Sequence, residues 1–387
     1  MTFLSCGDII YVMRLTYKYR LSPTKAQRTA LDSTLEACRL VYNKTLATRK
    51  EAYEQEGVSL SRFDTIKMLP AWKEQMPILN GVHSQVLQEV CARVDLAFKA
   101  FFRRARSGEE PGYPRFKGYG RYDSFTFPQS GFSFLDNGKL RMSKIGDVPI
   151  KLHREIRGEI KTLTVQRDTF GNWYACFSCE VEPRPLPPAD KVVGVDLGLK
   201  TFAVMSDGNK IERERWMKRD AKDVARLQRK KEKLAKGSPE RRKVVRALQH
   251  AYRRSSRRRD DFAHKVSRDL VNTYQVICLE KLDIVDMQSR GNRVINRGIA
   301  DVAWGKVAQY CVYKAEDAGR TVVHVNPRGT TQECSGCYKI VSKDLSVRVH
   351  DCPHCGLRID RDLNAAINIL RRGLASLGIQ SVEAQVL

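Results

Sequence analysis

The alternation of apolar and polar residues predicts a strand at the start of the chain, followed by two long helices. Apolar or aromatic side chains alternate with basic or polar ones through residues 13–21, the pattern of a half-buried strand. The spacing then becomes helical over residues 25–53 and again over residues 82–106, where valines recur four apart. The segment that follows, from Ser107 to Tyr122, is rich in glycine, proline and aromatic residues and indicates a loop.

Short strands are expected after this loop, and the clearest of them form a hairpin. Residues 163–168 (LTVQRD) and 173–181 (WYACFSCEV) flank the turn TFGN and predict a β-hairpin. The proline-rich segment 183–188 (PRPLPP) then reads as a stiff linker and a domain boundary. Buried strands are expected at VVGVDLG, which starts at Val192, and at VICLE, which ends at Glu280.

The chain is strongly basic. Its 387 residues carry 69 Lys and Arg against 44 Asp and Glu, a net charge of +25. Such an excess indicates a polyanionic partner, most often nucleic acid. Residues 210–259 hold 21 Lys and Arg but only 6 Asp and Glu. Gly237, Ser238 and Pro239 divide this basic stretch into a predicted helical hairpin.

The basic hairpin is open to two interpretations, a nucleic-acid contact or a solvated helical face. Nucleic-acid contact is favoured because one cluster of arginines has few acidic neighbours in sequence. The cluster comprises Arg253, Arg254, Arg257, Arg258 and Arg259.

Nothing in the sequence predicts a membrane or secreted protein. No apolar run approaches the roughly 18 residues of a transmembrane helix, and the N-terminus lacks the basic region of a signal peptide. Met13 opens the first predicted strand and is an alternative natural start. Eleven cysteines, four of them in a metal-like pattern, favour a reducing cytoplasm over a disulfide framework.

Three acidic residues are the candidate catalytic groups. Asp196 interrupts a buried strand, Glu280 ends a later one, and Asp362 lies near the start of an apolar C-terminal helix. Carboxylates that converge in one crevice raise each other's pKa, and two hard cations such as Mg²⁺ or Mn²⁺ relieve that repulsion. Two such metal ions, bound side by side, can activate water and stabilise the leaving oxygen in phosphodiester hydrolysis.

Taken singly, each acid is weak evidence, because an Asp or Glu at a strand end is more often a turn former or an ion-pair partner. Their order along the chain, two strand carboxylates and one on a C-terminal helix, is typical of an RNase H-like nuclease. Asp360 lies two residues from Asp362 and is interpreted as the helix N-cap rather than a ligand.

Two Cys-x-x-Cys motifs predict a structural zinc site. The ligands are Cys334, Cys337, Cys352 and Cys355, and four thiolates leave no open position for catalysis. His350 and His354 are interpreted as neighbours that fill space. A third Cys-x-x-Cys, Cys176 to Cys179, lies within a strand and is interpreted as core packing.

These motifs together resemble the TnpB (OrfB) family of transposon-encoded proteins related to miniature type V CRISPR effectors. The resemblance rests on GVDLG, LEKL, TTQECSGC with CPHCG, and DRDLNAAINI, and also on RLSPTKAQ, PRFK and DFAHK nearer the N-terminus. It covers roughly residues 13–372. The sequence departs from the family at Tyr338, where glycine is usual, which predicts a distorted first zinc knuckle that keeps its ligands.

The resemblance implies an RNA-guided DNA endonuclease with a multidomain α+β fold. A wedge β-barrel and a helical recognition lobe would precede an RNase H-like (RuvC) α/β domain with an inserted zinc ribbon. The implied segments are an extension (1–12), wedge (13–38 and 108–185), recognition lobe (39–107), RuvC-like domain (190–332 and 357–373) containing the basic hairpin (210–259), zinc ribbon (333–356) and tail (374–387).

The family also implies the partners and the site residues. Asp196, Glu280 and Asp362 would hold Mg²⁺ or Mn²⁺, and the four ribbon cysteines Zn²⁺. The partners would be a guide RNA from the transposon end and target double-stranded DNA, bound by a monomer with one RNA in a prokaryotic cytoplasm, acting at the nucleoid. A polar helix face with Ser84, Gln85 and Gln88 would read a short duplex motif beside the target, since Gln can pair with adenine edges. A plain solvated helix face is the open alternative for these three residues.

Three other interpretations are considered. A guide-dependent DNA-binding regulator without cleavage is disfavoured by the intact acidic triple. A transposase or junction resolvase on the same fold would need far less than the long N-terminal half. A compact type V CRISPR effector stays open, since gene context would decide it.

Overall fold

A computed structural model describes residues 12–214, 216–282, 296, 303–344 and 347–379. The chain forms two compact units, residues 1–182 and 183–387, which divide at the start of the proline-rich linker. Residues 1–11 of the expected N-terminal extension and the last eight residues of the tail, 380–387, lie outside the described residues.

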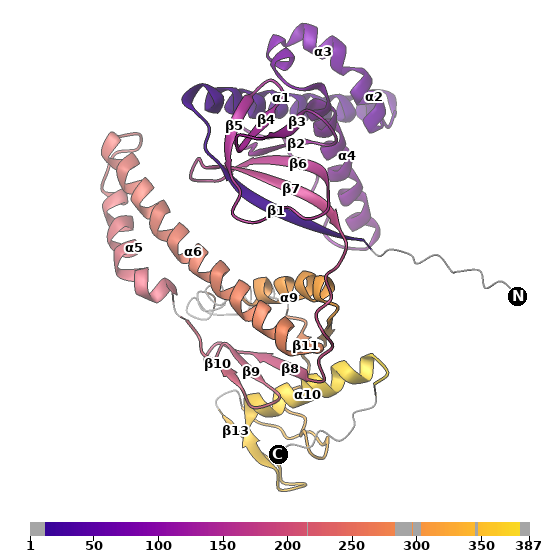
Figure 1. The fold of residues 1–387 in the computed structure, drawn as a ribbon, viewed down its shortest axis with the longest axis vertical. Helices are drawn as coiled ribbons and strands as arrows, with labels where there is room; N and C mark the ends of the chain where they lie inside the picture. The colour runs from indigo at the N-terminus through magenta and orange to yellow at the C-terminus, as the bar shows by residue number, and fades with distance from the viewer. Residues whose placement is uncertain (1–11, 215, 283–295, 297–302, 345–346, 380–387) are drawn as a thin grey trace, which may run out of the picture. The chain divides into compact units, whose positions relative to one another are not determined.

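The first unit combines one antiparallel sheet with a set of helices (Figure 1). Its helical elements are α1 (Lys25–Glu56), α2 (Arg62–Lys67), α3 (Leu69–Gln75), the 3₁₀ helix η1 (Pro77–Gly81) and α4 (Ser84–Arg106). Its strands are β1 (Met13–Leu21), β2 (Ser124–Phe127), β3 (Phe132–Leu135), β4 (Lys139–Met142), β5 (Gly146–Lys151), β6 (Glu159–Arg167) and β7 (Trp173–Val181). The predicted first strand, two long helices and hairpin are thereby confirmed.

The seven strands follow the order β2-β6-β7-β1-β5-β4-β3, and the sheet curls until its two edges nearly meet. The rings of Phe127 on β2 and Phe132 on β3, the two edge strands, lie 6.2 Å apart. Alternate residues of β7 are buried, from Trp173 to Val181, so one face of the sheet forms the core. A nearly closed sheet of this kind is the coarse feature expected of a wedge barrel.

Helix α1 is continuous across residue 38, where the sequence interpretation placed a domain boundary. Thr24 caps it through a capping box with Gln27, and Gly57 ends it with φ 67°. The finer division of residues 13–107 into wedge and recognition lobe therefore has no structural break at that point.

The second unit contains a five-stranded mixed sheet and a small two-stranded sheet. Its strands are β8 (Val192–Leu197), β9 (Ala203–Met205), β10 (Lys210–Ile211), β11 (Val276–Glu280), β12 (Thr321–Val325), β13 (Val349–Asp351) and β14 (Arg358–Asp360). Its helices include α5 (Trp216–Glu232), α6 (Pro239–Thr273), α9 (Trp304–Ala318) and α10 (Arg361–Ser376).

The large sheet of the second unit has the order β10-β9-β8-β11-β12. Strands β8, β11 and β12 are parallel, whereas β9 pairs antiparallel with β8, and β10 pairs antiparallel with β9. Helices α6 and α9 cover one face of the sheet through Val193, Val195, Ile277 and Leu279. Helix α10 covers the other, where Val276 and Cys278 pack against Ile369 and Leu374 (Figure 1).

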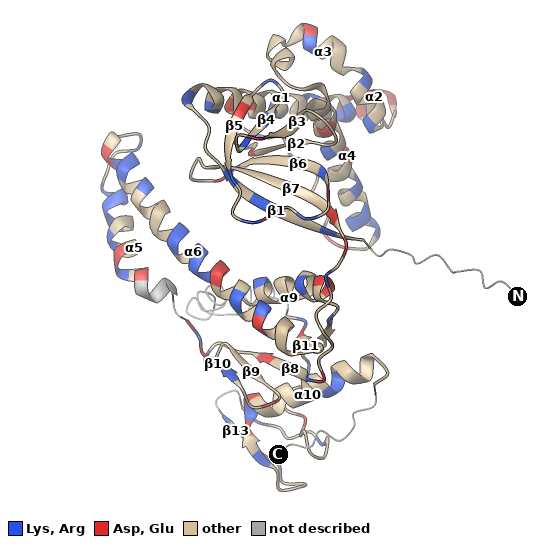
Figure 2. Ribbon diagram, in the orientation of Figure 1, with Lys and Arg blue, Asp and Glu red and all other residues tan. Residues whose placement is uncertain are grey.

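The predicted basic hairpin is formed by α5 and α6, which pack against each other. Ser238 caps α6 by accepting a hydrogen bond from the N–H of Arg241, and Pro239 opens the helix. The second arm is longer than expected, because α6 continues to Thr273 and reaches the sheet. Figure 2 shows Lys and Arg along both arms.

None of the helices in the described part of the chain is long and apolar enough to cross a membrane.

Candidate active site and zinc ribbon

Asp196 and Glu280 lie at the same edge of the large sheet, on neighbouring parallel strands. The register pairs Val195 of β8 with Leu279 of β11, so the two acids follow at corresponding positions. Side chains alternate along a strand, and the residues that precede the acids by two, Gly194 and Cys278, face α10. Both carboxylates therefore lie on the sheet face that α10 covers.

Helix α10 approaches the sheet closely because two glycines remove side chains from the contact. A Cβ atom at Gly194 would lie 2.1 Å from the carbonyl oxygen of Ala366, and one at Gly373 would lie 2.2 Å from the Cys278 Sγ. No such contact is possible for a larger residue without movement of the backbone. The close packing fixes the start of α10, with Asp362 in its first turn, beside the two strand acids.

The electrostatics at Asp196 agree with a shared acidic site. Burial, followed by the negative charges of Glu280 and Asp362, raises the pKa of Asp196 to about 8, against the opposing effect of Arg361. Burial also raises the pKa of Glu280, although its hydrogen bond from Thr330 and the charge of Arg372 oppose this. Both carboxyl groups are therefore harder to ionise than a free carboxyl group, and a bound cation would favour their ionised forms.

Asp362 is held by arginines in this structure. Its carboxylate accepts hydrogen bonds from Arg361 at 2.9 and 3.0 Å and lies 3.8 Å from an Arg348 nitrogen. Among the described residues, the three acids do not form a group whose oxygens all lie within 4.8 Å of one another. In this structure, two carboxylates of the site lie on the sheet, and the third, that of Asp362, is bound by arginine side chains.

Asp360 caps α10, as its position in the sequence suggested. Its Oδ1 accepts hydrogen bonds from the N–H groups of Asp362 and Leu363, at 2.8 and 3.2 Å. Burial alone would raise the pKa of Asp360, but these N–H groups and Lys210 lower it. Asp360 is therefore committed to the helix terminus.

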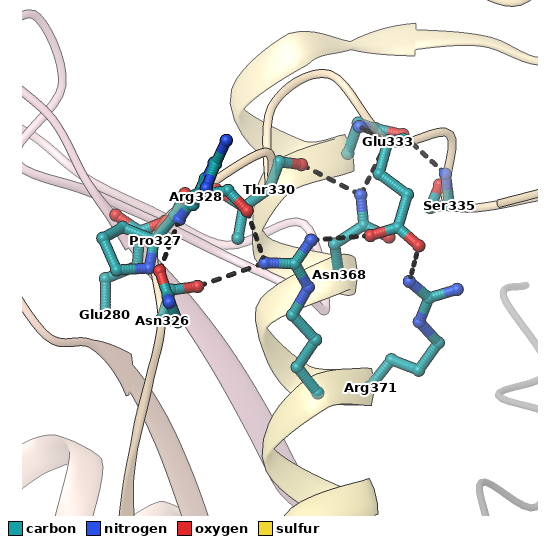
Figure 3. Close-up of polar contacts among 11 residues, drawn as sticks. Glu280, Asn326, Pro327, Arg328, Thr330, Glu333, Ser335, Asn368 and Arg371 are labelled. Atoms are coloured by element: carbon teal, nitrogen blue, oxygen red, sulfur yellow. Dashed lines mark hydrogen bonds and ion pairs between the residues drawn. The ribbon is translucent and has the colours of Figure 1, made fainter. Parts of the chain in front are cut away.

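A polar network between α10 and the segment that precedes the ribbon was not foreseen from the sequence (Figure 3). Asn368 donates to the carbonyl oxygens of Thr330 and Glu333, at 2.9 and 2.7 Å, and Asn364 donates to that of Glu333 at 2.8 Å. The signal was present in DLNAAINIL, where two asparagines four residues apart share one face of an otherwise apolar helix. Buried asparagines on such a face require partners.

The four predicted zinc ligands converge. Cys334, Cys337, Cys352 and Cys355 place their sulfur atoms within 4.8 Å of one another, and two of the sulfur pairs are 3.6 Å apart. Each knuckle closes with a hydrogen bond of 2.9 Å to the carbonyl of its first cysteine, donated by the N–H of Tyr338 or of Gly356. Four sulfurs in this compact arrangement suit a tetrahedral zinc ion.

The chemistry of these donors also suits a cation. Although burial opposes ionisation of Cys352, the N–H groups of His354 and Cys355 and the neighbouring thiols lower its pKa. The Leu357 N–H group lowers the pKa of Cys355, but burial and the other three thiols outweigh it and raise that pKa. The thiolate is the form that binds zinc.

The expected distortion of the first knuckle is wrong. Tyr338 adopts the left-handed conformation with φ 66°, close to the φ 75° of Gly356 at the same position of the second knuckle. The guanidinium of Arg371 lies 4.0 Å from the centre of the Tyr338 ring. This cation–π contact offsets the strain of a non-glycine residue at a positive φ.

The remaining motif residues take structural places. His350 is fully buried in the ribbon and its Nδ1 contacts Lys343. Cys179 lies in the sheet core of the first unit, as expected, whereas Cys176 points to the opposite face of β7. Within the described part of the chain, the ribbon cysteines form the single cluster of three or more closely spaced ligand atoms.

The five arginines of α6 do not form a uniform set. Arg254 and Arg258 lie 3.0 and 3.6 Å from the carboxylate of Asp220, a buried residue of α5. Arg253 contacts His250, and Arg259 is half-buried. Arg257 is exposed, and with Arg253, Arg254 and Arg258 it lines a groove of about 650 Å³ between the two helices. The sequence missed Asp220 because the partner lies 34 residues away.

The polar face of α4 is partly engaged within the first unit. Ser84 accepts a hydrogen bond from Lys73 at 2.9 Å, and the Gln85 Oε1 accepts one from the Ser130 hydroxyl at 2.9 Å. Gln88 lies one turn beyond Ser84 and is exposed. Of these three side chains, those of Ser84 and Gln85 are each held by a neighbour, whereas that of Gln88 is exposed.

Three family models match successive parts of the chain. They are a helix-turn-helix domain of OrfB over residues 13–58, OrfB of IS605, described as a "Probable transposase", over residues 176–290, and a Cas12f1-like TNB domain over residues 304–369. The last of these includes the four ribbon cysteines and Asp362.

Relatives extend the match to nearly the whole chain. A Streptomyces pristinaespiralis protein named "Putative RNA-guided DNA endonuclease" is 33% identical over 372 residues, which is 94% of this chain and 90% of the relative. A protein of Escherichia coli K12 named "Putative RNA-guided DNA endonuclease InsQ" is 29% identical over 93% of this chain and 92% of its own length.

The fold is similar to that of a solved structure, a Cas12f1–sgRNA–target DNA complex. The match has a TM-score of 0.57 at 12% identity and covers 89% of this chain and 83% of that protein. The sequence motifs, the family models and the near full-length relatives agree, and the chain belongs to the OrfB (TnpB) family.

Proposed function

We propose that this protein is an RNA-guided DNA endonuclease. The single observation that carries the proposal is the placement of Asp196 and Glu280 at one sheet edge, under a helix that bears Asp362, with the pKa of Asp196 raised by burial and then by the other two acids. Relatives that span nearly the same length carry the name of this activity.

The second unit is proposed to be an RNase H-like (RuvC) domain. In support, its sheet has three parallel strands and an antiparallel pair beside β8, with α10 closing the acidic face. Two Mg²⁺ or Mn²⁺ ions, when bound there, would activate water and stabilise the leaving oxygen of a phosphodiester.

The chain's own residues would prepare the site for those ions. Burial makes the carboxylates of Asp196 and Glu280 costly to ionise without a compensating charge. Binding of a metal ion, which supplies that charge, would therefore be favoured. On metal binding, the Asp362 carboxylate would leave Arg361 and bind the metal ion instead. Arg361 and Arg348 would then contact the phosphate of the substrate in place of Asp362.

The zinc ribbon is proposed to hold one Zn²⁺ with a structural role. Segment 326–335 joins the ribbon to α10 through the asparagine network, so the ion would stabilise the element that carries Asp362 (Figure 3). The ribbon is thereby proposed to be part of the active-site scaffold.

Guide RNA and target double-stranded DNA are the proposed partners, with one RNA bound per monomer. The curled sheet and helices of the first unit would form the wedge and recognition lobe, with Gln88 of α4 the best placed to read bases. The charge of α5 and α6 supports contacts with phosphates, which position a duplex without reading its sequence.

Sequencing the RNA that co-purifies with the protein tests the proposal. We expect one dominant RNA species, and we expect its complex to cut DNA complementary to a segment of that RNA in the presence of Mg²⁺. The Asp196→Ala variant should bind the same DNA and leave it intact, since it loses a metal ligand and no phosphate contact. Cutting by this variant at the wild-type rate, or a protein that carries no RNA, would contradict the proposal.

A further inference from the structure

Glu280 is held by a hydroxyl from outside its own strand. The Thr330 Oγ1 lies 2.7 Å from the Glu280 Oε1, and both residues are buried. Within the described part of the chain, this is the one hydrogen bond that the Glu280 carboxylate makes. The other oxygen, Oε2, is left without a protein donor there.

Thr330 is itself fixed on several sides (Figure 3). Its hydroxyl also lies 3.0 Å from the Pro327 carbonyl oxygen, and its own carbonyl accepts a hydrogen bond of 2.9 Å from Asn368. Asn368 donates a second bond, to the carbonyl of Glu333, so one side chain of α10 ties both residues. The hydroxyl is therefore delivered to Glu280 from a rigid position.

The same network reaches the zinc ligands. The Glu333 carboxylate pairs with Arg371 and Arg372 of α10, and the Ser335 N–H donates to Asn364 at 2.9 Å. Cys334 lies between Glu333 and Ser335 and is completely buried. Arg372 also donates hydrogen bonds to the carbonyl oxygens of Asn326 and Arg328. Residues 326–335 therefore contact α10 near both of their ends.

We propose that Thr330 is a positioning residue that orients the Glu280 carboxylate for metal binding and connects it to the zinc ribbon. The inference rests on the proposed nuclease function of the Glu280 site. A carboxylate that rotates freely loses affinity for a cation because its orientation must be fixed on binding. A hydroxyl that holds Oε1 removes that cost and directs Oε2 toward the ligand position.

Removing a side chain that hydrogen-bonds to a metal ligand has a characteristic effect on metal affinity. Loss of such a hydrogen bond weakens metal affinity by about 10- to 100-fold in other sites. Thr330 is 2% exposed, so its side chain is not available to contact DNA directly. Its loss should therefore affect the metal dependence and leave guided DNA binding unchanged.

The test compares Thr330→Val, which keeps the shape, with Thr330→Ser, which keeps the hydroxyl. Thr331→Val is the matched control, since the neighbouring side chain makes no hydrogen bond within the described residues. The first readout is Mn²⁺ binding to the DNA-free protein, measured by electron paramagnetic resonance of the free ion. The second is the Mg²⁺ concentration that gives half-maximal guided cleavage.

We expect Thr330→Val to weaken Mn²⁺ binding and raise the Mg²⁺ requirement by about 10-fold or more, and Thr330→Ser to restore both. Unchanged Mn²⁺ affinity and Mg²⁺ requirement in Thr330→Val would overturn the inference, as would equal losses in the valine and serine variants. If the valine variant loses zinc or does not fold, Thr330→Ala and Thr330→Ser form the deciding pair.

Failure of the nuclease proposal gives a different result. A wild-type complex that never cuts guided DNA contradicts the proposed function, whatever Mn²⁺ affinity the variants show. A wild-type complex that cuts, with variants that bind Mn²⁺ equally well, contradicts the role of Thr330 alone.

Discussion

At the scale of single residues, Asp196 illustrates how the sheet geometry creates an unusual acid. It lies on the α10 face of β8, two positions after the glycine that admits the helix, and its pKa rises to about 8. In the unfolded chain the same group has an ordinary pKa near 3.8. The folded protein therefore retains a proton that the unfolded chain has already lost.

The pH dependence of stability follows from this difference. Between about pH 4 and pH 8 the native state binds more protons, so the free energy of unfolding of the metal-free protein falls as pH rises. Asp196→Asn removes this effect and should raise the free energy of unfolding at about pH 8 by on the order of 1–3 kcal/mol. Melting curves in chelator from about pH 5 to pH 9 check it, and parallel pH profiles for the two proteins would contradict it.

Gly194 gives a prediction about the approach of α10. Gly194→Ala places a methyl group 2.1 Å from the Ala366 carbonyl oxygen, so α10 must move away from β8 and carry Asp362 with it. We expect destabilisation of about 1–3 kcal/mol, together with loss of most guided cleavage. Gly112→Ala is the control, because nothing lies within 4 Å of its added methyl group. Full cleavage by Gly194→Ala would show that the close approach is dispensable.

The site residues divide by what a sequence can reveal. Asp196, Glu280 and Asp362 could be predicted because acids at the ends of apolar segments are conspicuous. The pairing of Asp362 with Arg361 and the hydroxyl that Thr330 provides to Glu280 could not, because they depend on side-chain orientation and on contacts 50 residues apart.

At the scale of elements, the α5–α6 hairpin separates arginines that hold the protein together from arginines that are available to a partner. Arg254 and Arg258 neutralise Asp220, which is 7% exposed, whereas Arg257 lies exposed at the groove. The sequence showed the excess of charge and the turn at Gly237, and the register between the two helices decided which arginines are paired.

Two variants separate these roles. Arg257→Gln should flatten the dependence of log affinity on log salt by about 0.9 for one duplex phosphate contact, and leave the melting temperature unchanged. Arg254→Gln should lower the melting temperature, because a buried carboxylate loses a partner. Binding measured from low to moderate salt, with thermal melting alongside, checks both. An unchanged salt slope for Arg257→Gln would leave that side chain as solubilising charge.

The zinc ribbon gives a second prediction at this scale. We expect elemental analysis of the reduced protein to find one zinc per chain, and Cys352→Ser to lose it. Because Ser335 and Glu333 bind α10, the loss should also reduce guided cleavage. Cys176→Ser, from the motif on β7, is the control and should keep its zinc. Zinc-free wild-type protein with full activity would contradict this account.

At the scale of the whole molecule, the proline-rich segment predicted the boundary between the two units. Alternating patterns predicted β1, β6 and β7, and apolar runs predicted β8 and β11, whereas most of the short strands were not predicted. The curl of the first sheet and the continuity of α1 past residue 38 could not be read from the pattern, because local periodicity contains no information on closure or on domain limits within a helix.

Guide dependence is the central property proposed for the molecule. If base pairing supplies the sequence and the protein supplies shape recognition and chemistry, the target must follow the RNA. The most direct measurement replaces only the target-pairing segment of the co-purified RNA and maps the cut sites on a plasmid that carries both the old and the new complementary sequences, next to the same flanking motif. We predict that cleavage moves entirely to the new sequence and stops with Asp196→Ala. Cleavage that stays at the old sequence, or that occurs without RNA, would contradict the account.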